Sequence, residues 1–241
     1  MLLEARGVKK SYAIGDREIP VLKGVDLSIH DGEIVALLGS SGAGKSTLLH
    51  LLGLLDRPTE GDVLLASNPT AKSSVRQRAR MRRAGIGFVF QFYHLIPELT
   101  ALQNVLLGTM MRDSVLSWMG RRGSARARAK ELLDQVGLSE RQGHRPPQLS
   151  GGEKQRVAIA RALISEPKVI LADEPTGNLD SETAREVLEL LFQINRDRGI
   201  AFLLVTHDEG VAARCDRIIR MRDGTVVDDD VPTTQAAPTG A

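Results

Sequence analysis

The chain has 241 residues, enough for one large domain or two small ones, and its 42% hydrophobic and 26% charged content is ordinary for a globular protein. The net charge of +2 excludes a polyanion binder that works through bulk charge, and a single cysteine, Cys215, excludes an internal disulfide. The N-terminus has no signal-peptide pattern, and no apolar stretch reaches the ~20 residues that cross a bilayer. We therefore expect a cytoplasmic protein.

Two strands are predicted first. Residues 2–12 and 19–29 alternate apolar and polar side chains around a loop at 15–17, which is typical of an antiparallel pair. Tyr12 ends the first strand, where its ring could stack on a base, although the pattern alone supports this only weakly.

A phosphate-binding loop follows. The apolar run 34–38 predicts a strand and the run 48–55 a helix, and the residues between them satisfy G-x-x-x-x-G-K-[ST]. Glycines let successive N–H groups point at a phosphate, and the helix start adds its positive dipole end. Lys45 would reach the β- and γ-phosphates of a nucleotide, and the Ser46 hydroxyl would coordinate Mg²⁺. The predicted ATP-binding residues of this loop are Gly39, Ser40, Ser41, Gly42, Ala43, Gly44, Lys45, Ser46 and Thr47.

The next segment is strongly basic. After a predicted strand at 61–65, residues 72–83 contain six lysines and arginines, which could indicate nucleic-acid or anionic-lipid binding. Aromatic residues are 3% of the chain and none lies in this run, so the stacking platform of a single-strand binder is missing. We favour a solvated helix face and expect no nucleic-acid partner.

The remaining elements alternate between helix and strand. We expect strands at 86–91, 169–172 and 201–205, a hairpin at 218–227, and helices at 100–111, 124–136, 150–164 and 181–198, with a basic linker at 120–123. The alternation predicts an α/β sheet. We expect one domain over residues 1–228, with a helical part at roughly 95–150 and a disordered tail at 229–241.

Polar side chains end the predicted strands. Ligands of α/β sheets bind at the carboxyl ends of strands, so these side chains are candidates for chemistry. We assign Asp173 to the metal, Glu174 to general-base catalysis, and His207 to the γ-phosphate. Gln91 is expected to meet both the metal and the attacking water. Each assignment has an ordinary alternative when the motif is considered alone. Asp173 and Glu174 would then simply end a strand, and His207 would be a histidine without a functional role.

A second anion-binding helix start is predicted at Ser150, which is followed by two glycines. Ser150 and Glu153 fit a capping box, which is the ordinary explanation, but a cap does not need Gly151 and Gly152. One phosphate loop and one further phosphate-binding helix suggest a site completed by a second copy of the chain.

Together these motifs resemble the nucleotide-binding subunit of ABC transporters, from residue 2 to about residue 228. The resemblance implies a P-loop NTPase core with an N-terminal antiparallel β subdomain and an inserted α-helical subdomain. It implies that ATP closes a homodimer and that hydrolysis reopens it. It assigns Tyr12 to adenine stacking, and Ser150, Gly151, Gly152, Glu153 and Asp180 to the ATP held by the partner copy.

Within this family, the stretches 50–59, 87–98 and 174–180 look like the lipoprotein-releasing (LolD-like) ATPases. MacB-like exporters and FtsE-like cell-division ATPases share much of them, and the basic segment 112–128 looks longer than expected for the subfamily. The resemblance implies docking of membrane permease subunits near residues 91–98, at the cytoplasmic face of the inner membrane. The other classes considered are a soluble ABC ATPase acting on DNA or ribosomes, which the absence of heptads and the single domain disfavour, and a nucleotide sensor without turnover.

Overall fold

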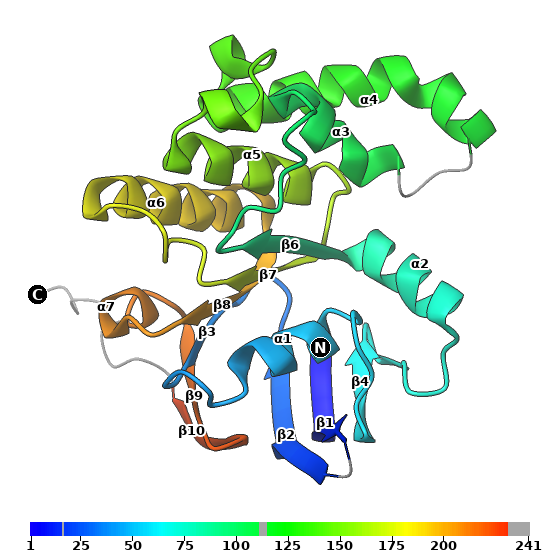
Figure 1. Ribbon diagram of the computed structural model, residues 1–241, viewed down its shortest axis with the longest axis vertical. Helices are drawn as coiled ribbons and strands as arrows, with labels where there is room; N and C mark the ends of the chain where they lie inside the picture. The colour runs from blue at the N-terminus through cyan, green and yellow to red at the C-terminus, as the bar shows by residue number, and fades with distance from the viewer. Residues whose placement is uncertain (16, 111–114, 231–241) are drawn as a thin grey trace, which may run out of the picture. The chain divides into compact units, whose positions relative to one another are not determined.

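The computed structural model describes residues 1–15, 17–110 and 115–230 (Figure 1). The chain forms two compact units, Met1–Lys72 with Ala201–Ala241, and Ser73–Ile200. Each unit contains both strands and helices, so the predicted α/β class is confirmed.

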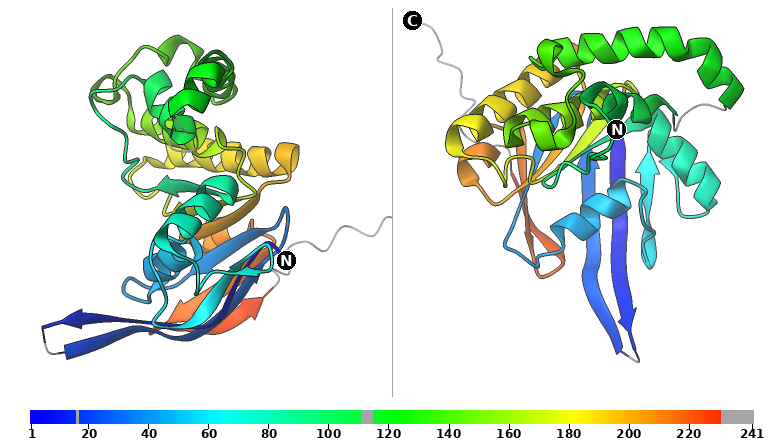
Figure 2. Two further views of the ribbon diagram at one scale, coloured as in Figure 1. Left: turned by 90° about the vertical axis from the view of Figure 1, so that its right-hand side faces the viewer. Right: turned by 45° about the horizontal axis from the view of Figure 1, so that its top comes forward.

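The first unit contains an antiparallel sheet with the order β2-β1-β4-β5. In both views of Figure 2, β1 and β2 run side by side as a long hairpin, as predicted. Val25, Leu27 and Ile29 are buried at alternate positions of β2, the period of a half-buried strand. The strands are β1 (Leu3–Ile14), β2 (Arg17–Ile29), β4 (Glu60–Leu65) and β5 (Asn68–Pro69).

The same unit contains a set of mainly parallel strands. They are β3 (Ile34–Leu38), β8 (Ala201–Thr206), β9 (Arg217–Arg222) and β10 (Thr225–Asp230), with the helices α1 (Lys45–Leu52) and α7 (Glu209–Ala212). β3 pairs in parallel with β8 and β9, and β10 pairs antiparallel with β9. β3 and β8 are buried along their whole length, as continuous apolar runs require. Because Leu38 lies opposite Thr206, the segments that follow β3 and β8 leave the strands at the same edge.

In the residues that the structure describes, the second unit is built on a parallel strand pair and five α-helices. β6 (Ile86–Phe90) pairs with β7 (Val169–Asp173), and Phe90 lies opposite Asp173, so Gln91 and Glu174 also begin at one edge. The helices are α2 (Val75–Gly85), α3 (Ala101–Met110), α4 (Val115–Gln135), α5 (Gly151–Leu163) and α6 (Ser181–Arg198). Short 3₁₀ turns at Ser139–Arg141 and Pro146–Gln148 join α4 to α5.

The predicted basic linker at 120–123 is wrong, because these residues lie inside α4. Each internal glycine costs about 1 kcal/mol of helix propensity, but burial of Ala129, Leu132 and Leu133 stabilises the later part of this 21-residue helix. Residues 112–114 of the basic segment 112–128 lie outside the described residues.

The solvated-face prediction for residues 72–83 is only partly right. Lys72, Arg76 and Arg80 are exposed, but Arg82 and Arg83 are half-buried and Arg78 is 9% exposed. Long arginine stems can pack along apolar surface while their heads reach polar groups, which a charge pattern does not reveal.

At the C-terminal end, β10 extends to Asp230, so the first two residues of the predicted tail belong to a strand. Asp229 and Asp230 are paired with Ile219 and Ile218 of β9. The rest of the predicted tail, residues 231–241, lies outside the described residues. In the described ranges 1–15, 17–110 and 115–230, no helix is both long and apolar enough to span a bilayer.

Candidate functional site

The predicted phosphate loop lies between β3 and α1, as expected. Gly44 takes the left-handed conformation with φ 97°, and α1 begins at the next residue. A Cβ at Gly39 would come within 2.5 Å of the Met221 carbonyl oxygen, so both positions require glycine. α1 has no side-chain cap and no acidic residue in its first turn, and the N-terminal end of a helix attracts an anion.

Lys45 lies across this loop. Its side chain is 7% exposed, and Nζ donates hydrogen bonds to the carbonyl oxygens of Gly39 at 2.6 Å and Ser40 at 2.9 Å. The ammonium is therefore held against the backbone that would surround a phosphate. Ser46 and Thr47 follow in the first turn of α1, with Ser46 exposed.

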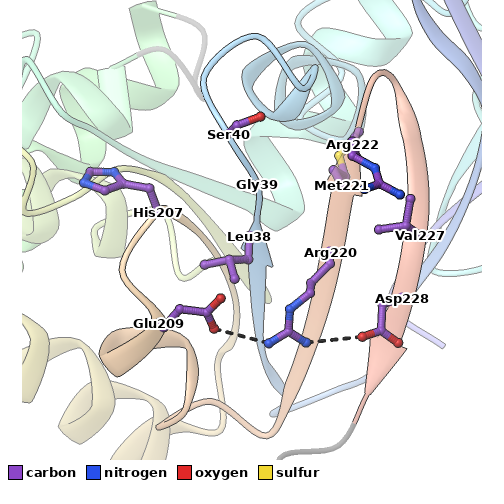
Figure 3. Close-up of a pocket in the computed structure, with 10 residues that line it drawn as sticks. All are labelled: Leu38, Gly39, Ser40, His207, Glu209, Arg220, Met221, Arg222, Val227 and Asp228. Atoms are coloured by element: carbon purple, nitrogen blue, oxygen red, sulfur yellow. Dashed lines mark hydrogen bonds and ion pairs between the residues drawn. The ribbon is translucent and has the colours of Figure 1, made fainter.

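His207 lies beside the loop. It follows β8 and lines a pocket of about 660 Å³ together with Gly39 and Ser40. Figure 3 shows Arg220 between Glu209 and Asp228 in the same pocket, with N···O distances of 3.2 and 3.3 Å. The structure thus brings His207 to the phosphate loop, and the register of β3 and β8 is the reason.

Tyr12 lies in β1, two residues before the strand ends at Ile14 and not at its end as predicted, and is 38% exposed. Lys10 Nζ lies 4.8 Å from its ring centroid, and the Tyr12 hydroxyl donates to Asp56 at 3.3 Å. Burial by itself raises the pKa of Asp56, but hydrogen bonds from Lys10 and the backbone N–H of Arg57 outweigh it and lower the pKa. These contacts fix the Tyr12 ring, and its stacking on adenine stays a prediction.

In the second unit, the structure brings Gln91 and Glu174 together around Gly177. A Cβ on Gly177 would lie 2.7 Å from Gln91 Nε2 and 3.3 Å from Glu174 Oε2. Asn178 joins them, because its Nδ2 donates to the Gln91 carbonyl at 3.1 Å and its Oδ1 accepts from Gln91 Nε2 at 3.3 Å. Asp173, the last residue of β7, is half-buried directly before Glu174.

The start of α5 has the predicted capping box. Ser150 Oγ accepts from the N–H of Glu153, and a Glu153 carboxylate oxygen accepts from the N–H of Ser150 at 2.7 Å. That backbone hydrogen bond lowers the pKa of Glu153 most strongly; burial opposes it, and Arg141, 3.0 Å away, lowers the pKa further.

The two glycines after Ser150 have a packing role that sequence reasoning missed. A Cβ at Gly151 would lie 3.1 Å from Leu179 Cδ2, and one at Gly152 would lie 2.3 Å from Thr183 Cγ2. Tight packing therefore explains Gly152 without any ligand, whereas a Cβ at Gly151 would displace the end of the Leu179 side chain only slightly. A role of either glycine in anion binding stays a prediction.

Asp180 also has a structural role that was not predicted. It is the N-cap of α6 and accepts from the N–H of Thr183 at 3.0 Å, which is the main reason why the pKa of Asp180 is lowered. Its predicted contact with the ATP of a partner copy stays a prediction.

Sequence reasoning also missed Gln155 and Gly177. Gln155 is completely buried in α5, and its Nε2 donates to the Pro175 carbonyl oxygen at 2.6 Å. The signal was present, since a glutamine on the face of α5 that carries Gly151 and Gly152 is an unusual choice for a buried position.

The donor set fits a magnesium ion better than a metal that prefers nitrogen or sulfur. The candidate ligands are the Ser46 hydroxyl, the Gln91 amide oxygen and the Asp173 carboxylate, all hard oxygen donors. Mg²⁺ is usually held by one or two carboxylates together with phosphates and water, so it needs no dense cluster. The described part of the chain contains no group of three or more His, Cys, Asp or Glu that could hold a metal.

Comparison with known proteins gives the family. Residues 22–177 match the family described as ABC transporter. The chain is 50% identical over 228 residues to the lipoprotein-releasing system ATP-binding protein LolD 2 of Rhodopirellula baltica, covering 95% of this chain and 89% of that protein. It is 49% identical to the macrolide export ATP-binding/permease protein MacB of the same organism, but spans only 33% of that longer protein.

A solved structure agrees with these relatives. The dimeric post-hydrolysis state of the ATP-binding cassette MJ0796 with ADP and Pi has a TM-score of 0.85 and 43% identity, covering 95% of this chain and 98% of that one. The predicted fold type and the resemblance are confirmed. The chain belongs to the ABC transporter family.

Proposed function

We propose that this chain is the ATP-hydrolysing subunit of a transport complex that releases lipoproteins from a membrane. The observation that carries the nucleotide site is the uncapped start of α1 behind Gly44, with the Lys45 ammonium held inside the loop. The relative named LolD 2, at 50% identity over nearly the full length, supports lipoprotein release over macrolide export.

Each predicted site residue has its own task in ATP hydrolysis. The loop N–H groups and Lys45 bind the phosphates, and Glu174 accepts the proton of the attacking water. His207 contacts the γ-phosphate, and Gln91 orients the attacking water. When bound, Mg²⁺ would neutralise developing phosphate charge, held by Ser46, Gln91 and Asp173.

A second copy of the chain completes the site in this proposal. The N-terminal end of α5 would contact the ATP held by the partner copy, with Ser150, Gly151, Gly152, Glu153 and Asp180 as the contributing residues. The dimeric MJ0796 cassette supports this arrangement for a chain with the same fold.

The membrane subunits are proposed to dock on the second unit near residues 91–98. Phe92 is 69% exposed and Ile96 is 42% exposed in this segment. A groove of about 360 Å³ lies next to it, lined by Ile96 and the stacked Phe88 and Phe90 rings, which lie 5.7 Å apart. Exposed apolar side chains beside a groove are typical of a site for a partner helix. The chain would then act peripherally, at the cytoplasmic face of the inner membrane.

The test uses Glu174→Gln, which should keep ATP binding but slow hydrolysis by roughly 10²–10⁴ and so preserve the ATP-bound dimer. The variant is purified from native membranes with Mg-ATP, and its partners are identified by mass spectrometry. Integral membrane subunits with bound lipoproteins are expected. An efflux or cell-division partner would instead select a related transporter class, and recovery of only ribosomal or DNA-associated proteins would exclude a transport function.

A matched control addresses the docking surface. Phe92→Ser removes an exposed apolar side chain without touching the predicted catalytic residues, so it should lose the membrane subunits and keep basal ATP hydrolysis. Retention of the membrane subunits by Phe92→Ser would place their docking surface elsewhere.

A further inference from the structure

Helix α5 contacts the segment that follows β7 at three points on one face. Gly151 lies against Leu179 and Gly152 against Thr183, since a Cβ on these glycines would come within 3.1 Å and 2.3 Å of the two side chains. One turn further along, Gln155 Nε2 donates to the Pro175 carbonyl oxygen at 2.6 Å. This third contact is the only polar one of these three.

Gln155 is a costly choice if its role is packing alone. Its side chain is 0% exposed, and its Oε1 has no hydrogen-bond partner among the described residues. A buried acceptor without a donor opposes folding, so methionine or leucine would fill the same space at a lower cost. What the amide adds is the hydrogen bond to Pro175.

The residue before Pro175 is Glu174, and its backbone is in an unfavourable conformation. Glu174 has φ 43°, in the left-handed region that L-residues with side chains rarely adopt. Such a conformation persists only where its surroundings hold it. Two contacts do so here: the Gly177 N–H bonds to the Glu174 carbonyl at 3.0 Å, and Gln155 holds the next carbonyl along the chain.

We infer that Gln155 is a positioning residue that holds the Glu174–Pro175 turn, and thereby the Glu174 carboxylate, in the orientation needed to accept a proton from water. This inference rests on the proposed role of Glu174 as the general base. Because Gln155 lies on the helix whose N-terminal end would contact the partner's ATP, it joins that helix end directly to the catalytic turn of its own chain.

The test is Gln155→Met, a substitution close in volume that removes the hydrogen bond and the unpaired acceptor together. ATP turnover of the purified chain should fall about 10- to 100-fold, as expected when a catalytic group loses its alignment, with KM for ATP changed less than about twofold. The melting temperature should stay within a few degrees of wild type. In the Glu174→Gln background, Gln155→Met should cause no further loss of turnover and no change in ATP-dependent dimerisation.

A matched control removes a similar bond elsewhere. Asn195 Nδ2 donates to the Ile200 carbonyl oxygen at 2.9 Å at the other end of α6, so Asn195→Leu loses an amide-to-carbonyl bond far along the chain from Glu174. Asn195→Leu should lower the melting temperature and leave turnover within twofold of wild type.

Three outcomes would overturn the inference. Gln155→Met with wild-type turnover would show that the bond does not position Glu174. If the turnover losses from Gln155→Met and Glu174→Gln multiply in the double variant, Gln155 acts elsewhere. The same conclusion follows if Gln155→Met reduces ATP-dependent dimerisation in the Glu174→Gln background. Unslowed turnover in Glu174→Gln would overturn the role of Glu174 as the general base, on which the inference rests. Absence of ATP turnover by the wild-type chain would instead overturn the proposed function itself, so the two failures are distinguishable.

Discussion

Substituting Gly152 by alanine separates the packing role of the α5 glycines from a role in binding. A Cβ at this position would lie 2.3 Å from Thr183 Cγ2, about 1 Å short of the 3.4 Å at which ordinary contact begins. Either the Thr183 side chain must rotate or α5 and α6 must move apart. Overpacking of this kind costs roughly 1–3 kcal/mol.

Alanine recovers part of this cost, because it is a better helix former than glycine by up to ~1 kcal/mol. The free energy of unfolding of Gly152→Ala should therefore fall by roughly 0–2 kcal/mol, which corresponds to a drop in melting temperature of up to roughly 8 °C for a chain of this size.

The double variant Gly152→Ala/Thr183→Ser tests the cause. Serine lacks Cγ2, the atom in the way, but keeps the hydroxyl that contacts Asp180. Urea unfolding should show that Thr183→Ser restores the stability lost by Gly152→Ala, giving a favourable coupling energy in the double-mutant cycle. ATP turnover should stay low in the double variant, because the added Cβ still obstructs the approach of a phosphate to the helix start.

Equal stabilities of Gly152→Ala with and without Thr183→Ser would refute the packing argument. Recovery of turnover together with stability would instead refute the binding role, and would leave Gly152 as a packing residue.

Three further perturbations test separate parts of the molecule. Lys45→Ala should weaken ATP binding by about 10²-fold or more, since two charge-assisted contacts of roughly 1.5–3 kcal/mol each are lost; unchanged affinity in a calorimetric titration would contradict this. The pKa of Glu153 is lowered mainly by the hydrogen bond from the Ser150 N–H; burial opposes this, and Arg141 lowers the pKa further. The ionised carboxylate therefore stabilises the fold at pH values above its ordinary pKa of 4.5, and this contribution is lost as the pH falls through the lowered pKa. Glu153→Gln should thus be less stable than wild type by up to about 1 kcal/mol at pH 7, with a difference that shrinks below pH 4.5; a difference independent of pH in urea titrations would count against it. Burial, with a smaller effect of Asp216, raises the pKa of Cys215 to about 12, so iodoacetamide at pH 8 should label the thiol in urea but not in the native protein, and rapid native labelling would show that Cys215 is accessible.

The phosphate loop, the strand ends and the element order could all be predicted from the sequence. Their signals are local: a glycine pattern between an apolar run and a helix, and polar residues directly after buried strands. Every long strand and helix apart from the first part of α4 was anticipated within a few residues. α4 was shortened in the prediction because glycine is normally a helix breaker, and burial further along the helix overrides that preference.

The contacts that hold the candidate catalytic turn depended on the tertiary structure. Gly152 lies against Thr183, Gln155 bonds to Pro175, and Gly177 lies against Gln91. The residues of these pairs are 31, 20 and 86 positions apart in the chain. Packing between such distant residues leaves no periodic pattern in either segment, because periodicity records only which face of an element is buried and not what it is buried against. For the same reason, the chain shows by itself that Glu174 ends a strand, while only the folded molecule shows which side chains hold it there.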